Sequence, residues 1–184
     1  LWQFMMKRWD SAFELMCRGI RRDNTKRDAA RAHLSAVKDE CKRQLDYIIR
    51  DDFNPQSPLQ TKWLAYELFA LPEIQDRKTR SASVNDDAMD QLQENEPLIK
   101  PFFNLIRRYR TTGVLLSNFI NTEGPDNRAY TSFNPMGPET FRWSSSKNPL
   151  GWGSNLQNIM RDDTEPNPAI RLPSMRDMFI PDEG

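Results

Sequence analysis

The chain has 184 residues, of which 38% are hydrophobic and 28% charged, and its 26 basic and 26 acidic side chains balance. This length suits one large domain, or one domain with part of another, and the balanced charge excludes net charge as a sign of a nucleic-acid partner. No apolar run approaches the roughly 20 residues that cross a bilayer, and the first residues lack the basic start and cleavage site of a signal peptide.

The first half of the chain is predicted to be helical. Residues 1–18 place apolar side chains three or four positions apart, and Gly19 can end that helix. The first helix is expected to bury one apolar face: Phe4, Met5, Trp9, Phe13 and Met16. A second helix is predicted from about residue 25 to 49, with an apolar stripe on one face: Leu34, Val37, Cys41, Leu45 and Ile48. Cys17 and Cys41 have no metal-binding spacing and are expected to be buried, reduced thiols.

Capping signals mark the next helices. Ser57-Pro58-Leu59-Gln60 matches a capping box with proline at the first helical position, so a helix is expected to about Phe69. Residues 75–82 are polar and basic, which predicts a loop, and Ser83 with Asp86 is expected to cap a short helix. Pro97 is predicted to open a longer helix with one apolar stripe: Leu98, Phe102, Leu105, Ile106, Tyr109, Leu116 and Phe119.

The composition changes near Asn121, after which glycine, proline, asparagine and serine dominate. Residues 129–133 could form a short strand, and residues 181–184 have the composition of a turn. A turn at that place should lead into a further strand, so we expect the chain to be a piece of a longer protein.

Two motifs joined at a fixed distance carry a family resemblance. Thr140-Phe141-Arg142-Trp143-Ser144-Ser145 precedes Asn155-Leu156-Gln157-Asn158-Ile159. Together they resemble the T-G-R-L-S-S and N-L-Q-N-I-P motifs of family A DNA polymerases, the bacterial and phage DNA polymerase I class. The glycine-rich insert at residues 150–154 is similar to the phage branch. Phe141 and Trp143 are bulkier than the residues that the family has there, so the groove beside Arg142 is expected to differ in shape.

Other segments extend the resemblance over nearly the whole chain. Phe53–Gln60 resembles the F-N-P-x-S-P-x-Q stretch of the family's thumb, and Lys78–Ser83 resembles its K-T-x-x-x-S-T-S loop. Arg171–Gly184 is similar to the stretch that leads to the first metal-binding aspartate. The resemblance implies an α+β fold. Residues 1–23 would be an entry helix and lead-in to the palm, residues 24–120 a helical thumb, and residues 121–184 the first part of a mixed palm that ends before the first metal-binding motif.

The resemblance also implies which residues contact DNA. Arg142 matches the arginine that tests the primer-terminal pair in the minor groove, and Asn155, Gln157 and Asn158 match sugar and minor-groove contacts. Hydroxyls, backbone N–H groups and cations of the thumb suit phosphates. The expected phosphate-binding residues are Lys78, Arg80, Ser81, Ser83, Arg110 and Arg161.

The complete enzyme is expected to extend a primer on a DNA template, in a bacterial cytoplasm or a phage-infected host. Its partners would be primer–template DNA, deoxynucleoside triphosphates and the rest of its own chain, with no membrane. Two Mg²⁺ ions would act in the complete enzyme, and none would bind here, because both metal-binding motifs would lie beyond Gly184. The fragment alone is therefore expected to be inactive, with no catalytic residue of its own.

Two alternatives from other classes stay open. The chain could be a non-catalytic DNA-binding accessory protein derived from a thumb, or a helical scaffold without a nucleic-acid role. His33 is the sole histidine, so neither a zinc site nor a catalytic triad is expected. Adjacent acids are expected to serve as caps or loop charges; these pairs are Asp51-Asp52, Asp86-Asp87 and Asp162-Asp163.

Overall fold

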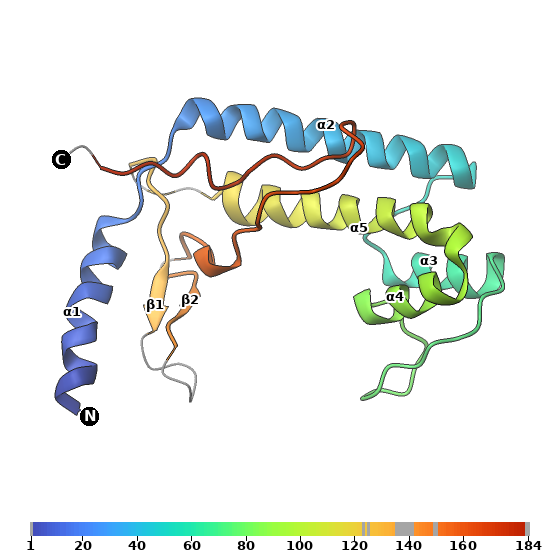
Figure 1. The fold of residues 1–184 in the computed structure, drawn as a ribbon, viewed down its shortest axis with the longest axis horizontal. Helices are drawn as coiled ribbons and strands as arrows, with labels where there is room; N and C mark the ends of the chain where they lie inside the picture. The colour runs from blue at the N-terminus through green and yellow to red at the C-terminus, as the bar shows by residue number, and fades with distance from the viewer. Residues whose placement is uncertain (1, 123, 125, 135–141, 149–150, 183–184) are drawn as a thin grey trace. The chain divides into compact units, whose positions relative to one another are not determined.

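The computed structural model describes residues 2–122, 124, 126–134, 142–148 and 151–182 (Figure 1). It divides into two compact units. The first consists of Leu1–Ser35 and Val114–Gly184, and the second of Ala36–Gly113. The helices α2 (Asn24–Ile49) and α5 (Lys100–Leu115) each contribute residues to both units.

The second unit is helical. Besides its parts of α2 and α5 it contains α3 (Pro58–Lys62), which continues as a π-helical turn over Trp63–Leu68, then α4 (Asp86–Asn95) and a 3₁₀ turn over Pro97–Ile99. Phe102 lies among three other rings, with centroids 6.3 Å from Phe53, 5.3 Å from Phe69 and 5.9 Å from Phe103. Aromatic pairs at such distances add to the stabilisation that apolar burial gives.

Caps fix where these helices begin. Ser57 Oγ accepts a hydrogen bond from Gln60 N at 3.3 Å, which confirms the predicted start of α3. The Gln60 side chain bonds Asn54 N at 2.7 Å, so it ties down the chain before the cap rather than closing a capping box with Ser57. The predicted cap of α4 was wrong: the N-cap is Asn85, whose Oδ1 accepts from Ala88 N at 2.9 Å. Ser83 Oγ instead accepts from Asn85 N.

The first unit contains the sheet. Helix α1 (Trp2–Arg18) ends at Gly19, whose φ of 65° is the left-handed conformation that glycine adopts readily. Strands β1 (Ser132–Asn134) and β2 (Ser144–Ser146) pair antiparallel, with Phe133 opposite Ser145. A π-helical turn over Leu116–Ile120 follows α5, and a 3₁₀ turn over Leu156–Asn158 follows β2.

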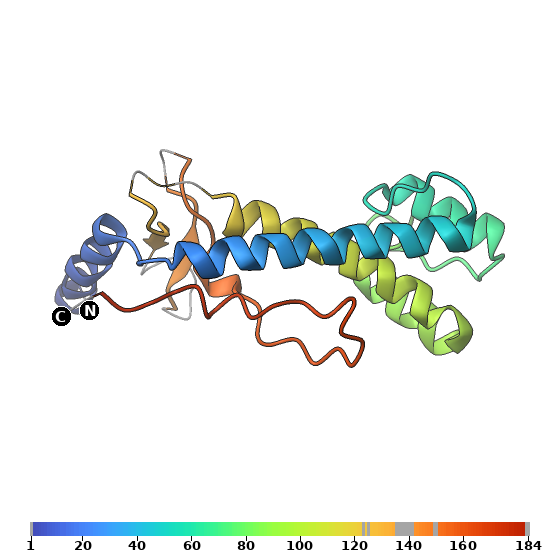
Figure 2. The same ribbon diagram turned by 90° about the horizontal axis from the view of Figure 1, so that it is seen from above.

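The last described segment is extended. Residues 159–182 form neither a helix nor a paired strand of more than one residue, and Figure 2 shows them as a long red trace. Backbone hydrogen bonds hold this segment to the connection between α1 and α2, from Asp23 N to Met178 O at 2.9 Å and from Ile180 N to Arg21 O at 3.1 Å. The segment also supplies core side chains to the first unit: Ile170, Leu172, Met175 and Met178.

The fold is α+β, as predicted, and the α2 stripe is buried from Leu34 to Leu45. Some predicted core positions were wrong, because Phe13, Ile48 and Leu98 are 63%, 50% and 91% exposed. Cys41 is buried as expected, whereas Cys17 is exposed. Among the helices that the structure describes, none combines the length and the apolar character needed to cross a membrane.

Candidate nucleic-acid interface

Hydrogen bonds join the two halves of the polymerase-like motif. Gln157 Nε2 donates to Trp143 O at 2.8 Å, and Leu156 N donates to Ser145 Oγ at 3.1 Å. Asn155 Oδ1 accepts from Gln157 N at 3.1 Å, which caps the 3₁₀ turn. Segments a dozen residues apart in the sequence therefore form one surface.

The Ser145 side chain connects this surface to Thr131, the residue before β1. Ser145 Oγ lies 2.5 Å from Thr131 Oγ1, and that hydroxyl also donates to Ser146 O at 3.0 Å. Ser145 and Thr131 are both buried. Separating two buried hydroxyls that bond each other would cost free energy. The contact therefore holds β2 in position, and with it Arg142 and Trp143, which directly precede the strand.

The glycine-rich insert packs closely against Tyr130. Gly153 has a φ of +81°, and a Cβ atom added there would lie 1.9 Å from Tyr130 O. Ser154 N donates to the same carbonyl at 3.2 Å. Only glycine fits such a backbone-to-backbone approach, so the insert returns the chain toward β1 before the Asn155 turn begins.

The side chains that could contact DNA are on the outside of this assembly. Arg142, Gln157 and Asn158 are exposed, and Asn155 is half-buried. Trp143 is half-buried, with its ring 5.6 Å from that of Phe133 and 5.5 Å from the Arg8 guanidinium carbon. Thr140 and Phe141 lie outside the described residues. Arg161 is exposed, in the extended segment that follows the 3₁₀ turn.

The predicted loop of the second unit is organised by one carboxylate. Asp76 Oδ1 accepts hydrogen bonds from Lys78 N at 2.8 Å and from Thr79 N at 2.9 Å. These backbone N–H bonds hold the pKa of Asp76 below its usual range. Arg80 completes the turn with a φ of 53°, and its N–H donates to Asp76 O.

This loop presents the residues expected to contact phosphates. Lys78, Arg80 and Ser81 are exposed, whereas Ser83 is half-buried and its carbonyl accepts from Tyr66 Oη. The loop borders a hollow of about 750 Å³ that mixes basic and acidic side chains. Its lining includes Arg77, Lys78, Asp76, Asp87 and Asp90. The hollow is therefore less electropositive than the loop tip itself.

Arg110 differs from the other predicted contacts because its guanidinium is bonded within its own unit. Nε donates to Pro55 O at 2.7 Å, and Nη2 donates to Thr61 Oγ1 at 2.9 Å. Burial lowers the pKa of this guanidinium, with a small opposing effect of Asp86. These contacts give Arg110 a clear structural use. A DNA contact by Arg110 stays a prediction.

The acidic pairs behave as local charges. Asp52 pairs with Lys42 at 2.9 Å, which lowers the carboxyl pKa, and Asp86 and Asp87 occupy the first turn of α4. Within the described part of the chain, no three histidine, cysteine, aspartate or glutamate side chains group as metal ligands.

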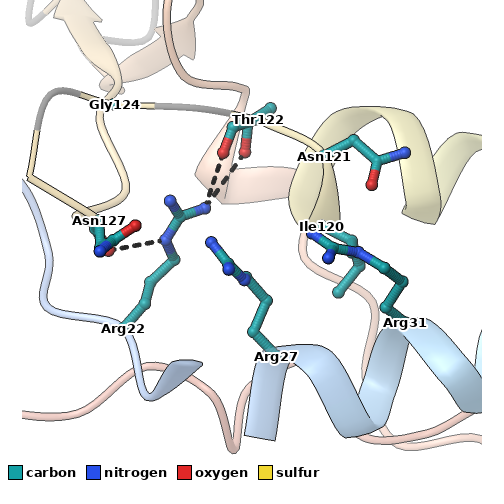
Figure 3. Close-up of a pocket in the computed structure, with 8 residues that line it drawn as sticks. All are labelled: Arg22, Arg27, Arg31, Ile120, Asn121, Thr122, Gly124 and Asn127. Carbon is teal, nitrogen blue, oxygen red and sulfur yellow. Dashed lines mark hydrogen bonds between the residues drawn. The ribbon is translucent and has the colours of Figure 1, made fainter. Parts of the chain in front are cut away.

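One basic cluster was missed by the sequence analysis. Arg22, Arg27 and Arg31 line a cavity of about 450 Å³ in the first unit, together with residues of the segment that follows α5 (Figure 3). The spacing of Arg27 and Arg31, four apart on one helix face, was visible in the sequence. Nothing in the sequence linked them to Arg22 or to residues 120–127.

Comparisons with known proteins agree with the joined motif. The model of DNA polymerase family A matches residues 25–184. A DNA polymerase I of Bacillus caldotenax is 30% identical over 143 residues, which are 72% of this chain and 14% of that protein. The solved polymerase domain of Pol1 from M. smegmatis, in complex with DNA primer-template and dNTP, has a similar fold: the TM-score is 0.71 at 24% identity, over 94% of this chain and 28% of that one. The chain thus spans a small part of each relative, and it belongs to DNA polymerase family A.

Proposed function

We propose that this chain is the part of a template-dependent DNA polymerase that holds the primer–template duplex. The observation that carries the proposal is the pair of hydrogen bonds from Gln157 to Trp143 and from Leu156 to Ser145, which joins the two motif halves beside the exposed Arg142. In the whole enzyme, residues 24–120 would be the thumb and 121–184 the first part of the palm.

The chemistry of the Arg142 surface suits contacts that do not depend on sequence. Minor-groove edges of all base pairs present similar acceptors, so an arginine there can bind any correctly formed pair. The amides of Gln157 and Asn158 both donate and accept without adding charge. In this chain Gln157 uses one amide N–H to orient the Trp143 carbonyl, and its remaining polar groups are exposed to a ligand.

The loop at residues 76–83 would contact the backbone of the duplex. Asp76 already bonds the N–H groups of Lys78 and Thr79, so the loop would bind phosphates through its side chains. Lys78 and Arg80 supply exposed cations, and Ser81 supplies an exposed hydroxyl. Such contacts give affinity that falls as salt rises.

The complete enzyme would add deoxynucleotides to a primer with two Mg²⁺ ions at carboxylates outside this chain. The 184-residue chain itself would bind duplex and would not extend a primer. Template-dependent extension by the purified chain, above that of a mock preparation, would contradict this assignment.

The test compares Arg142→Ala with Arg43→Ala, which removes an exposed arginine paired with Glu40 on α2. Binding of a fluorescent primer–template duplex is followed by anisotropy at several salt concentrations. We expect Arg142→Ala to weaken binding about tenfold, because a hydrogen-bonded charged group contributes roughly 1.5 kcal/mol or more. Arg43→Ala should change little.

The two surfaces should differ in salt dependence. A Lys78→Ala/Arg80→Ala variant should lower the slope of log affinity against log salt by about two, roughly one for each phosphate that the loop no longer binds. Arg142→Ala should leave the slope nearly unchanged. Equal affinities for the parent chain, Arg142→Ala and the loop variant would refute the proposal.

A further inference from the structure

Three arginines from two segments meet in the first unit. Arg22 lies in the short connection between α1 and α2, and Arg27 and Arg31 lie on the first two turns of α2. Figure 3 shows their guanidinium groups turned toward the same cavity. The rest of the wall comes from the segment after α5: Ile120, Asn121, Thr122, Gly124 and Asn127. No acidic residue is among the described lining residues.

The Arg22 side chain lines the cavity and is held by hydrogen bonds. This side chain is buried, with the residue 5% exposed, and it bonds two carbonyls: Nε donates to Asn127 O at 3.1 Å and Nη1 to Thr122 O at 3.0 Å. These bonds orient the guanidinium and connect it to Thr122 and Asn127. These two carbonyls carry no formal negative charge, and among the described residues none forms an ion pair with Arg22.

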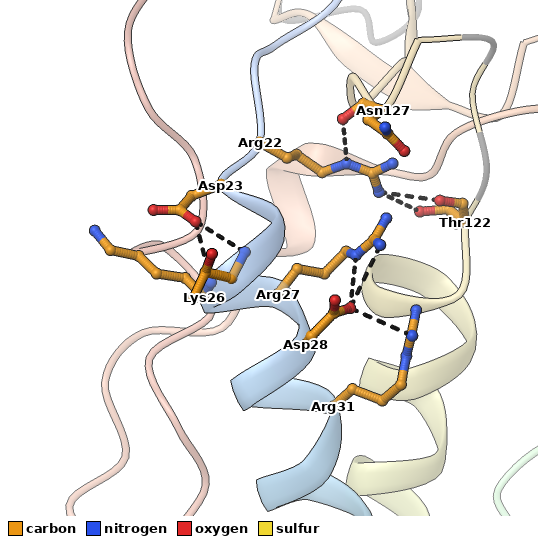
Figure 4. A network of polar contacts seen from close by, with 9 residues as sticks. Arg22, Asp23, Lys26, Arg27, Asp28, Arg31, Thr122 and Asn127 are labelled. Atoms are coloured by element: carbon orange, nitrogen blue, oxygen red, sulfur yellow. Dashed lines mark hydrogen bonds and ion pairs between the residues drawn. The ribbon is translucent and has the colours of Figure 1, made fainter.

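Among the described residues, acidic side chains neutralise the positive charges of Arg27 and Arg31 only weakly. The ion pairs that the structure describes for Arg27 and Arg31 both involve Asp28 Oδ1, at 3.4 Å from each, and Asp28 is 57% exposed (Figure 4). One carboxylate oxygen is thus shared by two cations at long range. In addition, Nε of Arg31 is buried without a hydrogen-bond partner. A buried donor left unpaired is rare and costs free energy.

The electrostatics agree with an excess of positive charge. The pKa of Arg22 is lowered first by burial and then by repulsion from Arg27 and from Arg31. Asp126 acts in the opposite sense more weakly, and its carboxylate accepts a hydrogen bond from Tyr130 Oη at 2.6 Å. Asp23 caps α2 by accepting from Thr25 N and Lys26 N. Asp23 therefore already bonds these two N–H groups at the start of α2. The positive charge at the cavity comes from the three arginines.

We propose that the pocket formed by Arg22, Arg27 and Arg31 binds a phosphate-class anion. Guanidinium groups match phosphate oxygens through paired N–H donors, and the cavity is of a size that accepts small anionic ligands. The anion's oxygens would accept hydrogen bonds from the guanidinium groups that line the cavity. The site shares no residue with the Arg142 surface or with the loop at 76–83. The phosphate can come from a free diphosphate or from a DNA backbone.

The experiment is calorimetric titration of the 184-residue chain with pyrophosphate at low ionic strength, without DNA. The parent chain should bind one pyrophosphate. The double variant Arg27→Gln/Arg31→Gln should bind at least tenfold more weakly. The control Arg43→Gln also removes a positive charge from α2 and should bind as the parent does. No saturable binding by the parent, or equal binding by the double variant, would overturn the proposal.

Two further arms keep the result decisive. Arg31→Lys keeps the charge and replaces the paired donors of the guanidinium group by a single ammonium, so it should bind severalfold more weakly even if the double variant does not fold. Parent-like binding by Arg31→Lys would overturn the proposal. Glu123 is the residue between Thr122 and Gly124 in the sequence. If pyrophosphate binds Glu123→Gln and not the parent chain, a carboxylate of the chain itself occupies the pocket and the proposal fails.

The source of the phosphate is decided with duplex DNA. If the double variant loses DNA affinity and pyrophosphate competes with DNA in the parent, the pocket takes a backbone phosphate. If DNA affinity is unchanged, the pocket takes a free anion. Either result supports the site. Because pyrophosphate binding is measured without DNA, failure of the Arg142 proposal would leave this test unaffected.

Discussion

At the scale of single residues, two glycines of the insert make a matched pair. Gly151 and Gly153 have nearly the same left-handed φ, +83° and +81°. Their surroundings differ, because a Cβ on Gly151 would meet nothing within 4 Å, whereas one on Gly153 would collide with Tyr130 O. An alanine would therefore be strained by its left-handed φ at both positions, but it would collide with a neighbouring atom only at position 153.

Gly151→Ala should destabilise the chain by about 1 kcal/mol, the usual cost of a left-handed alanine. Gly153→Ala should cost at least about 2 kcal/mol more, because backbone must move and the Ser154 N–H loses its bond to Tyr130 O. Urea unfolding measures both variants. Equal losses would show that the insert does not pack on Tyr130.

The two cysteines give a residue-scale prediction on reactivity. Burial raises the pKa of the Cys41 thiol to about 11, whereas Cys17 is exposed. Since the thiolate is the reactive form, a thiol reagent at pH 8 should modify Cys17 quickly and Cys41 only after unfolding. Mass spectrometry of the modified chain distinguishes the sites.

The raised pKa also sets the sign of a stability effect. The folded state favours neutral Cys41, so its contribution is fully present below the unfolded thiol pKa of about 8.5 and is lost as pH rises toward 11. A Cys41→Ala variant should lack this loss. Rapid modification of Cys41 in the folded chain would contradict the assigned burial.

At the scale of elements, periodicity predicted helices well and their covered faces less well. The α2 stripe was confirmed through Leu45 because the pattern is long and regular. Leu98 was misplaced because Pro97–Ile99 forms a 3₁₀ turn, which rotates it away from the α5 stripe. Among the α1 side chains that the structure describes, Ala12 is buried and Phe13 is exposed, whereas the burial of Phe4 and Met5 lies outside the described part. The sequence of a helix does not show which of its faces packs against another part of the protein.

For the candidate interface, the sequence predicted a set of residues but not the contacts that hold them together. The joined motif gave the residues around Arg142, but the hydrogen bond from Gln157 to Trp143 depends on a turn that the sequence does not specify. Arg110 shows the reverse case. Its basic helix suggested a DNA contact, and the structure bonds its guanidinium to Pro55 and Thr61. Charge in a sequence does not reveal which carbonyls come within reach.

The Arg110 contacts tie α5 to the start of α3. Arg110→Ala should destabilise the chain by about 1–3 kcal/mol, because buried acceptors lose a charged donor. Arg43→Ala serves as the control, since its ion pair with Glu40 is exposed and should contribute little. Thermal unfolding followed by circular dichroism compares them. A stable Arg110→Ala variant with reduced DNA affinity would instead give Arg110 a role in binding.

At the scale of the whole molecule, the 76–83 loop is the expected weak point to protease. Arg77, Lys78 and Arg80 are exposed in it, whereas Arg107 and Arg110 lie within α5 and bond other groups. Among sites between residues 24 and 120, trypsin should therefore cut first at 77–80. Both products supply core side chains of the second unit, such as Leu64 and Leu92, so they should elute together until denatured.

Gel filtration of the nicked chain, followed by denaturing electrophoresis, tests this expectation. First cuts within α5, or products that separate under native conditions, would show that the second unit is not held together by the core described. Loop cleavage should also lower duplex affinity, because Lys78 and Arg80 would no longer be held in one turn.

The division of the chain into two units has a consequence for folding during synthesis on the ribosome. The first unit combines Leu1–Ser35 with residues that begin at Val114, and the second unit is the uninterrupted stretch between them. Synthesis proceeds from the amino end, and domains generally fold as units. The second unit can therefore fold before residues 114–184, which complete the first unit with residues 1–35, have been synthesised. This protein would therefore fold from its centre outward, and the cavity lined by Arg22 would close only after Asn127 has emerged.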